Sequence, residues 1–90
     1  MNNFWVRTQG DGAIWQVHNF FIDEETNGAY SIKSFVFSER PIILGSYSSE
    51  VRAKEVFNMM CEHKRRVERA TFMTMQEARF VDPTFIMPLS

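Results

Sequence analysis

This 90-residue sequence is poor in cysteine, proline and glycine, and it contains no long hydrophobic run. Its one cysteine, Cys61, has no partner for a disulfide within the chain and therefore fits a reducing compartment. No apolar stretch approaches the ~20 residues that a membrane-spanning helix needs. The first residues also lack the basic segment and apolar run of a signal peptide. We therefore expect a protein without membrane contact that acts in the cytoplasm of the cell that makes it.

An excess of charge of either sign is missing as well. Ten Lys and Arg residues stand against eleven Asp and Glu residues, for a formal net charge of −1. Proteins that bind nucleic acid through its phosphates carry a clear positive excess, because neutralising phosphates supplies much of the affinity. Nucleic acid is therefore not an expected partner.

Hydrophobic residues, by contrast, are well represented. They make up 44% of the chain and include nine Phe, two Trp and two Tyr. Because each aromatic side chain removes a large area from water, a short chain of this composition is able to build a core. No repeat or linker divides the sequence, so we expect one domain over residues 1–90.

Turn residues divide the first half of the chain into four stretches that alternate like β-strands. The turn signals are Gly10-Asp11-Gly12, the pair Asn27-Gly28, which is typical of a type I′ hairpin, and Pro41. The predicted strands cover residues 4–9, 13–23, 29–38 and 42–47, in the order of an antiparallel meander. Gly45, near the end of the fourth strand, is expected to mark a bulge or a close approach of another group.

A long amphipathic helix is predicted next, capped by Ser48 or Ser49. Its apolar stripe, expected to face the sheet, consists of Ala53, Val56, Phe57, Met60 and Val67. Residues 71–75 alternate like a strand, residues 75–79 fit a helix, and residues 84–87 lie between two prolines. The predicted fold is α+β: a four-stranded antiparallel β-meander packed by one long α-helix, with a C-terminal strand or extended tail.

The second predicted strand is apolar on both faces. The side chains expected on one side are Ile14, Phe20 and Ile22, and those expected on the other are Ala13, Trp15, Val17 and Phe21. An antiparallel sheet with one helix on it normally has a polar outer face. We therefore expect a cover from the C-terminal segment, a partner protein or a second copy of the chain, most simply in a homodimer. The expected interface residues are Trp15, Phe21, Phe72, Met73, Met75, Phe80, Phe85, Ile86 and Met87.

One basic cluster lies toward the end of the predicted helix. A solvated helix terminus explains it, because cations are favoured there. The alternative is a binding site for a nucleotide or cyclic nucleotide, whose phosphates meet the cations while its base stacks on a ring. The residues of that alternative site are Lys64, Arg65, Arg66 and Arg69 with Trp5, Trp15 or Tyr47.

No catalytic or metal-binding set stands out. Cys61 and His63 are two residues apart on the helix and so point in different directions, and His18 belongs to the distant second strand. The acidic run at residues 23–25 lacks the ligand spacing of a calcium loop, and no Gly-x-Ser-x-Gly elbow occurs. We therefore predict a protein that is not an enzyme and that uses no metal or cofactor.

Three segments stand out by their order and spacing: FWVRTQ (residues 4–9), LGSYSSE followed by RAKEV (residues 44–50 and 52–56), and FIMP (residues 85–88). They resemble segments of small proteins encoded by phages and prophages of Gram-positive bacteria. The resemblance implies a phage accessory product in a bacterial cytoplasm and supplies no catalytic or binding residues. It favours a non-catalytic protein that binds, and inhibits, a host defence or regulatory protein. The alternatives are sequestration of a nucleotide signal and a structural role in the phage particle.

Overall fold

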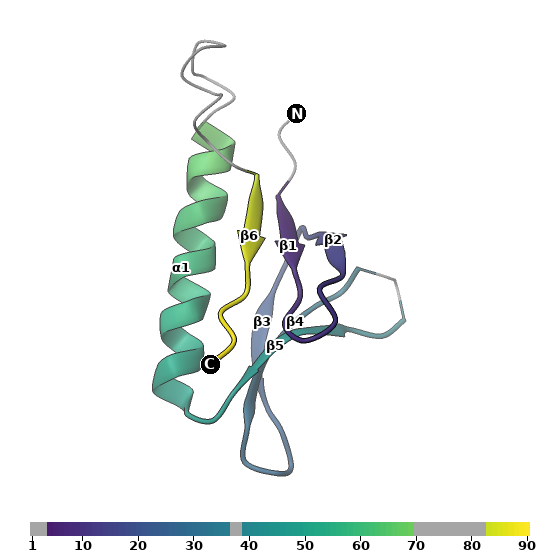
Figure 1. The fold of residues 1–90 in the computed structure, drawn as a ribbon, viewed down its shortest axis with the longest axis vertical. Coiled ribbons are helices and arrows are strands. Elements are labelled where there is room, and N and C mark those ends of the chain that lie inside the picture. The colour runs from purple at the N-terminus through teal and green to yellow at the C-terminus, as the bar shows by residue number, and fades with distance from the viewer. Residues whose placement is uncertain (1–3, 37–38, 70–82) are drawn as a thin grey trace.

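The computed structural model describes residues 4–36, 39–69 and 83–90, which form six strands and one helix. The elements are β1 (Trp5–Arg7), β2 (Ile14–Gln16), β3 (Phe21–Glu24), β4 (Tyr30–Ser34), β5 (Ile42–Tyr47), α1 (Glu50–Arg69) and β6 (Thr84–Ile86). Figure 1 shows α1 along one side of the molecule with the strands beside it. The predicted α+β class and the long helix are confirmed.

The strands form two three-stranded sheets, so the prediction of a single four-stranded meander is wrong. Sheet A has the order β2-β1-β6, in which β1 is antiparallel to β2 and parallel to β6. Sheet B has the order β3-β4-β5 and is antiparallel throughout. The C-terminal segment therefore forms a strand: the Trp5 N–H donates to the Pro83 carbonyl at 2.9 Å and the Met87 N–H to the Arg7 carbonyl at 3.2 Å.

The second predicted strand is divided between the two sheets. The Val17 N–H still donates to the Phe4 carbonyl (2.9 Å), after which the chain bends and β3 begins. The bend shifts the in–out alternation by one residue. Trp15 and Val17 face the core from the side of sheet A, whereas Phe20 and Ile22 face it from the side of sheet B. Residues from both predicted faces thus serve one core, whereas Ile14 and Phe21 point away from it.

The Asn27-Gly28 turn joins β3 to β4 as predicted, but its geometry differs from the expected type I′. The Glu25 N–H donates to the Ala29 carbonyl at 2.8 Å, and the Gly28 N–H donates to the Glu25 carbonyl at 3.0 Å. Gly28 has φ +87°, whereas no non-glycine residue in the described ranges has positive φ. The connection is therefore a three-residue loop whose last residue is a left-handed glycine.

Gly45 in β5 fulfils both expectations for it. The β4–β5 register shifts beside the Ile32–Gly45 pair, which marks a bulge. A Cβ atom on Gly45 would lie only 2.8 Å from Met87 Cε and 3.0 Å from Tyr47 Oη. The small residue therefore lets the C-terminal segment and a tyrosine ring pack directly on the strand.

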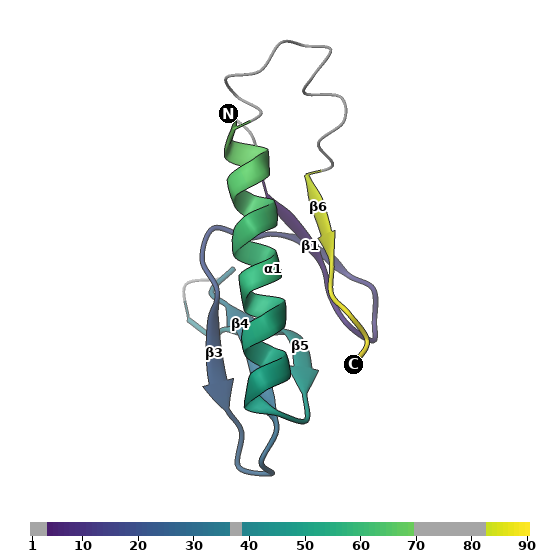
Figure 2. The same cartoon turned by 90° about the vertical axis from the view of Figure 1, so that its left-hand side faces the viewer.

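Helix α1 begins where the serine pair predicts it, since Ser49 Oγ accepts from the Arg52 N–H at 3.1 Å. Four of the five predicted stripe residues are buried: Ala53, Val56, Met60 and Val67. The fifth, Phe57, is partly buried because it lies toward β3, with its ring edge-on to Phe20 at a centroid distance of 5.1 Å. Figure 2 shows α1 lying across sheet B, with β3 on one side of it and β5 on the other.

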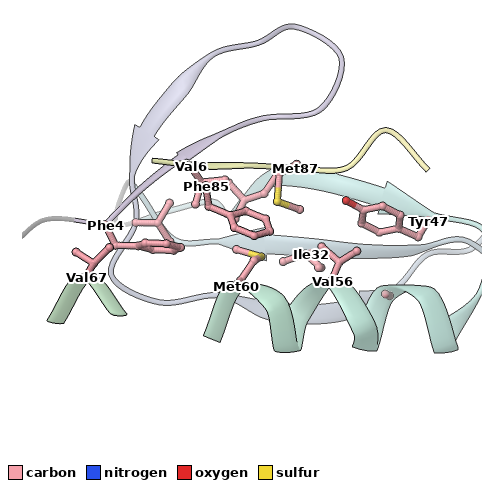
Figure 3. Close-up of a cluster of buried hydrophobic side chains, with 12 residues drawn as sticks. Phe4, Val6, Ile32, Tyr47, Val56, Met60, Val67, Phe85 and Met87 are labelled. Atoms are coloured by element: carbon pink, nitrogen blue, oxygen red, sulfur yellow. The ribbon is translucent and has the colours of Figure 1, made fainter. Parts of the chain in front are cut away.

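The core lies between α1 and the two sheets (Figure 3). Sheet A and the residues next to its strands contribute Phe4, Val6, Phe85 and Met87, the helix contributes Val56, Met60 and Val67, and sheet B contributes Ile32 and Tyr47. The C-terminal segment therefore completes the core as well as the sheet.

Gln9, which follows β1, forms hydrogen bonds both with β5 and with the C-terminal segment. Its N–H donates to the Leu44 carbonyl and its Oε1 accepts from the Ser46 N–H, both at 2.8 Å. Its Nε2 donates to the carbonyls of Pro88 at 2.8 Å and Leu89 at 2.9 Å. These contacts occupy polar backbone groups on the outer edge of β5, which is one of the two edges of sheet B.

Candidate functional site

The predicted basic cluster is split by the rotation of the helix. Lys64 and Arg65 line a hollow of about 340 Å³ on the flank of α1 that faces β3, whereas Arg66 lines one of about 280 Å³ on the flank that faces β6. Arg69 is the last helical residue and is exposed. Because successive residues are ~100° apart around a helix, Arg66 turns to the flank opposite the one that Lys64 and Arg65 share. The four cations do not converge on one site.

We call the first hollow the β3-side groove. It is lined by His18, Asn19, Phe20, Phe57, Cys61, Lys64, Arg65 and Glu68. Lys64 is paired with Glu68 at 3.3 Å, whereas Arg65 is exposed and has no ion pair within the described residues. The available positive charge of this groove therefore lies on Arg65.

The three rings predicted to stack on a base lie elsewhere. Trp5 and Trp15 are on sheet A and do not line the groove. Tyr47 is buried, and its hydroxyl donates to the Pro88 carbonyl at 2.9 Å. Burial raises the pKa of Tyr47, an effect that the nearby Arg52 charge partly offsets. The aromatic surface that does line the groove is that of Phe20 and Phe57, which the sequence presents only as apolar residues.

The groove also brings together two side chains that were expected to be far apart. His18 and Cys61 line it from opposite elements, so placing His18 far from the helix was wrong. His63 instead lies against Phe4 and Phe85, with ring centroids 5.9 and 5.6 Å away. Within the described ranges, no three His, Cys, Asp or Glu side chains gather as metal ligands would.

The predicted interface residues fall into three groups. Phe72, Met73, Met75 and Phe80 lie outside the described residues. Phe85, Met87 and, in part, Trp15 belong to the core of the same chain. Phe21 and Ile86 point outward, but from different sheets: the Phe21 ring stacks on Phe35 at 5.4 Å on sheet B, and Ile86 lies on sheet A. The structure thus assigns Phe85, Met87 and part of Trp15 to the core of the same chain and leaves Phe21 and Ile86 on its surface.

The outer face of sheet A carries an apolar and cationic surface, of which sequence reasoning had named Ile86 as an interface residue and Trp5 only as a ring of the alternative ligand site. Register places Arg7 between Ile14 on β2 and Ile86 on β6, and Trp5 between Gln16 and Thr84. We use the name outer face of sheet A for these residues: Trp5, Arg7, Ile14, Gln16, Thr84 and Ile86. The surface is not visible in the sequence because β6 comes from the other end of the chain. Only the pairing of β6 with β1 brings its residues beside those of β1 and β2.

Arg7 occupies the middle of this face. An added Cβ on Gly12 would contact the Arg7 guanidinium at 3.4 Å, so the arginine side chain extends over the turn between β1 and β2. No ion pair involves Arg7 within the described residues. A central strand with a tryptophan and with an arginine that has no ion pair in the described ranges, flanked by two exposed isoleucines, has the composition of a protein-binding surface.

Within the part of the chain that the structure describes, no helix combines the length and hydrophobicity needed to cross a lipid bilayer. Comparison with protein-family models, with curated proteins and with solved structures finds no significant match to this chain. What the protein does must therefore be inferred from its own residues.

Proposed function

We propose that this protein is a non-catalytic phage or prophage accessory protein that acts in the bacterial cytoplasm by binding a host protein. Inhibition of a defence or regulatory protein is the role that fits a small binding module of this kind. The observation that carries the proposal is the outer face of sheet A, where Ile14 and Ile86 are 56% and 64% exposed on either side of Arg7. The resemblance of residues 44–56 to phage-encoded proteins supports the biological setting.

The chemistry of the face indicates the kind of partner. Two exposed isoleucines leave apolar area in water that a partner would cover, and Trp and Arg are the residue types that most often dominate binding energy. The uncompensated Arg7 calls for a carboxylate in the partner surface, because a charge covered without a counter-charge costs binding energy. The expected partner is a folded host protein with an apolar patch beside an acidic side chain.

Affinity capture from a Gram-positive host lysate tests this surface. We expect the wild-type chain to retain a host protein that Ile86→Glu and Arg7→Glu both lose. Ile43→Glu is the matched control, because Ile43 is 54% exposed on the outer face of sheet B and undergoes the same change. Circular dichroism and thermal melting establish that all the variants are folded.

The outcome of the control decides the interpretation. If Ile43→Glu also loses the host protein, or if Ile86→Glu and Arg7→Glu keep it, the outer face of sheet A is not the binding surface. If no host protein is retained at all, binding to a host protein through this surface is excluded.

A second candidate function is sequestration of a nucleotide in the β3-side groove. The specific observation in its favour is that Lys64 and Arg65 share this groove with the Phe20 and Phe57 rings. Against it, Lys64 is paired with Glu68 and the remaining cations lie elsewhere. Thermal-shift screening with nucleotides and cyclic nucleotides separates the two functions: a rise in Tm that Arg65→Glu abolishes would favour the ligand binder.

A further inference from the structure

Among the described residues, β3 is an edge strand of sheet B, and only one side of its backbone has a partner strand. The Glu25 N–H donates to the Ala29 carbonyl, which fixes the phase of the β3–β4 ladder. In an antiparallel pair, residues alternate between bonding the neighbour strand and pointing away from it. Phe21 and Asp23 therefore bond β4, and the backbone groups of Ile22 and Glu24 point to the open edge. The other edge of the sheet, at β5, is occupied by Gln9.

The outer edge of β3 carries negative charge at one end and positive charge at the other. Its C-terminal end carries Asp23, Glu24 and Glu25. Lys33 contacts Asp23 at 2.7 Å and Glu25 at 2.9 Å, and these carboxylates raise the pKa of Lys33. Glu24 has no ion pair within the described residues and lies 3.4 Å from the Tyr30 hydroxyl. Its charge therefore has no counter-ion in the part of the chain that the structure describes.

The N-terminal end of the same edge leads into the β3-side groove. Phe20 immediately precedes β3 and lines that groove, together with Arg65. Arg65, like Glu24, has no ion pair among the described residues. Within residues 4–36, 39–69 and 83–90, one edge of the sheet thus presents a carboxylate without an ion pair at one end and a guanidinium without an ion pair at the other.

We propose that two copies of this chain associate by antiparallel pairing of their β3 edges, with the Glu24 of each copy in the β3-side groove of the other. A two-fold axis makes this charge pattern complementary to itself, because each acidic end meets the basic end of the partner. Pairing joins the two sheets B into one continuous six-stranded sheet and gives the outward backbone groups of Ile22 and Glu24 their partners. The proposal goes beyond the proposed function and depends on different residues.

Side-chain chemistry selects the register. A two-fold axis at Ile22 places an apolar side chain opposite its own copy and places the partner's Glu24 opposite Phe20, at the groove that holds Arg65. Shifting the axis to Asp23 or Glu24 would oppose two like carboxylates, which is unfavourable. Phe20 and Ile22 both pack on the core side of the sheet, and Glu24 lies on the same face as its register partner Tyr30, so the partner's Glu24 would reach the helix side of the sheet.

Within one chain, Glu24 and Arg65 are too far apart to meet. The electrostatic neighbours of Tyr30 include Glu24, Glu50 and Lys54, so Glu24 lies beside the first turns of α1. Arg65 lies about 22 Å further along the helix axis than Glu50, at a rise of ~1.5 Å per residue. Any energetic coupling between Glu24 and Arg65 would therefore report a contact between two copies.

Sedimentation equilibrium of the full chain tests the pairing through a charge swap. We expect the wild type to dimerise at tens of micromolar, and Glu24→Lys or Arg65→Glu alone to weaken association roughly tenfold, since each change acts at two symmetric contacts. The double variant should regain most of the wild-type association. Glu62→Lys is the control: it changes the net charge as Glu24→Lys does, but it lies on the opposite flank of α1 and should leave the dissociation constant unchanged.

Each of the other results would overturn the proposal. A wild-type chain that stays monomeric at these concentrations excludes the dimer. A double variant no better than the single variants excludes the contact between Glu24 and Arg65, as does an equal loss with Glu62→Lys. Thermal melting of each variant shows that the fold is intact, because all three side chains are exposed.

Discussion

Met60→Ala is expected to lower the free energy of unfolding by about 2–5 kcal/mol, the usual cost of removing a fully buried methionine side chain. Met60 has 0% exposure and lies in the middle of α1. Its side chain faces Phe85 of sheet A (Figure 3). Alanine is a better helix former than methionine, so the loss measures packing and the cavity left behind. Urea denaturation followed by circular dichroism gives the value.

The neighbouring residue supplies a matched control for this prediction. Met59→Ala makes the same chemical change one position earlier, where the side chain is 45% exposed and is not part of the core. We expect a loss of less than about 1 kcal/mol. Equal losses for Met59→Ala and Met60→Ala would show that the buried stripe of α1 has been assigned to the wrong face.

Phe85→Ala is expected to cost about 3–5 kcal/mol, because it empties a ring-sized volume between sheet A and the helix. The Phe85 ring is 7% exposed and lies edge-on to His63 at 5.6 Å, and its backbone is paired with Val6 across the β1–β6 ladder. The same denaturation measurement applies. A large loss would establish that the C-terminal strand is a structural part of the fold.

Ile86→Ala is the comparison for this second prediction, since Ile86 is the next residue and is mostly exposed. Its loss should stay below about 1 kcal/mol. If Phe85→Ala is as mild as Ile86→Ala, β6 does not complete sheet A. The outer face of sheet A would then lack one of its three strands, and the proposed binding surface would fail with it.

Local patterns were sufficient to predict the helix and β5. The recurrence of Ala53, Val56, Met60 and Val67 at helical spacing identified the buried stripe, and the serine cap located the start of α1. Gly45 was correctly assigned as a bulge and a point of close packing. Each of these features depends on residues that are near one another in the chain, so periodicity and turn chemistry carry the information.

The division into two sheets was not predictable in the same way. The bend between Val17 and Phe21 carries neither proline nor glycine, and it changes the face on which apolar residues fall. The resulting pattern is therefore the same as that of one strand with two apolar faces. The parallel pairing of β1 with β6 is also invisible locally, because it joins Val6 to Phe85 across most of the sequence.

The candidate surfaces also depend on pairing and packing that local sequence patterns do not reveal. Sequence identified the basic residues Lys64 to Arg66 but not their separation onto two flanks, which follows from helix rotation and from what packs beside each flank. The sequence analysis predicted no role for Arg7, which is one residue of a short strand. It becomes the centre of a surface only because β2 and β6 place Ile14 and Ile86 on either side of it.

The central claim is that the outer face of sheet A binds a host protein, and site-specific photo-crosslinking in living Gram-positive host cells tests it most directly. A photoreactive amino acid at position 86 should form a covalent adduct with one host protein, whereas the same group at position 43, on the outer face of sheet B, should not. An adduct that appears equally from both positions, or from position 43 alone, would contradict the account.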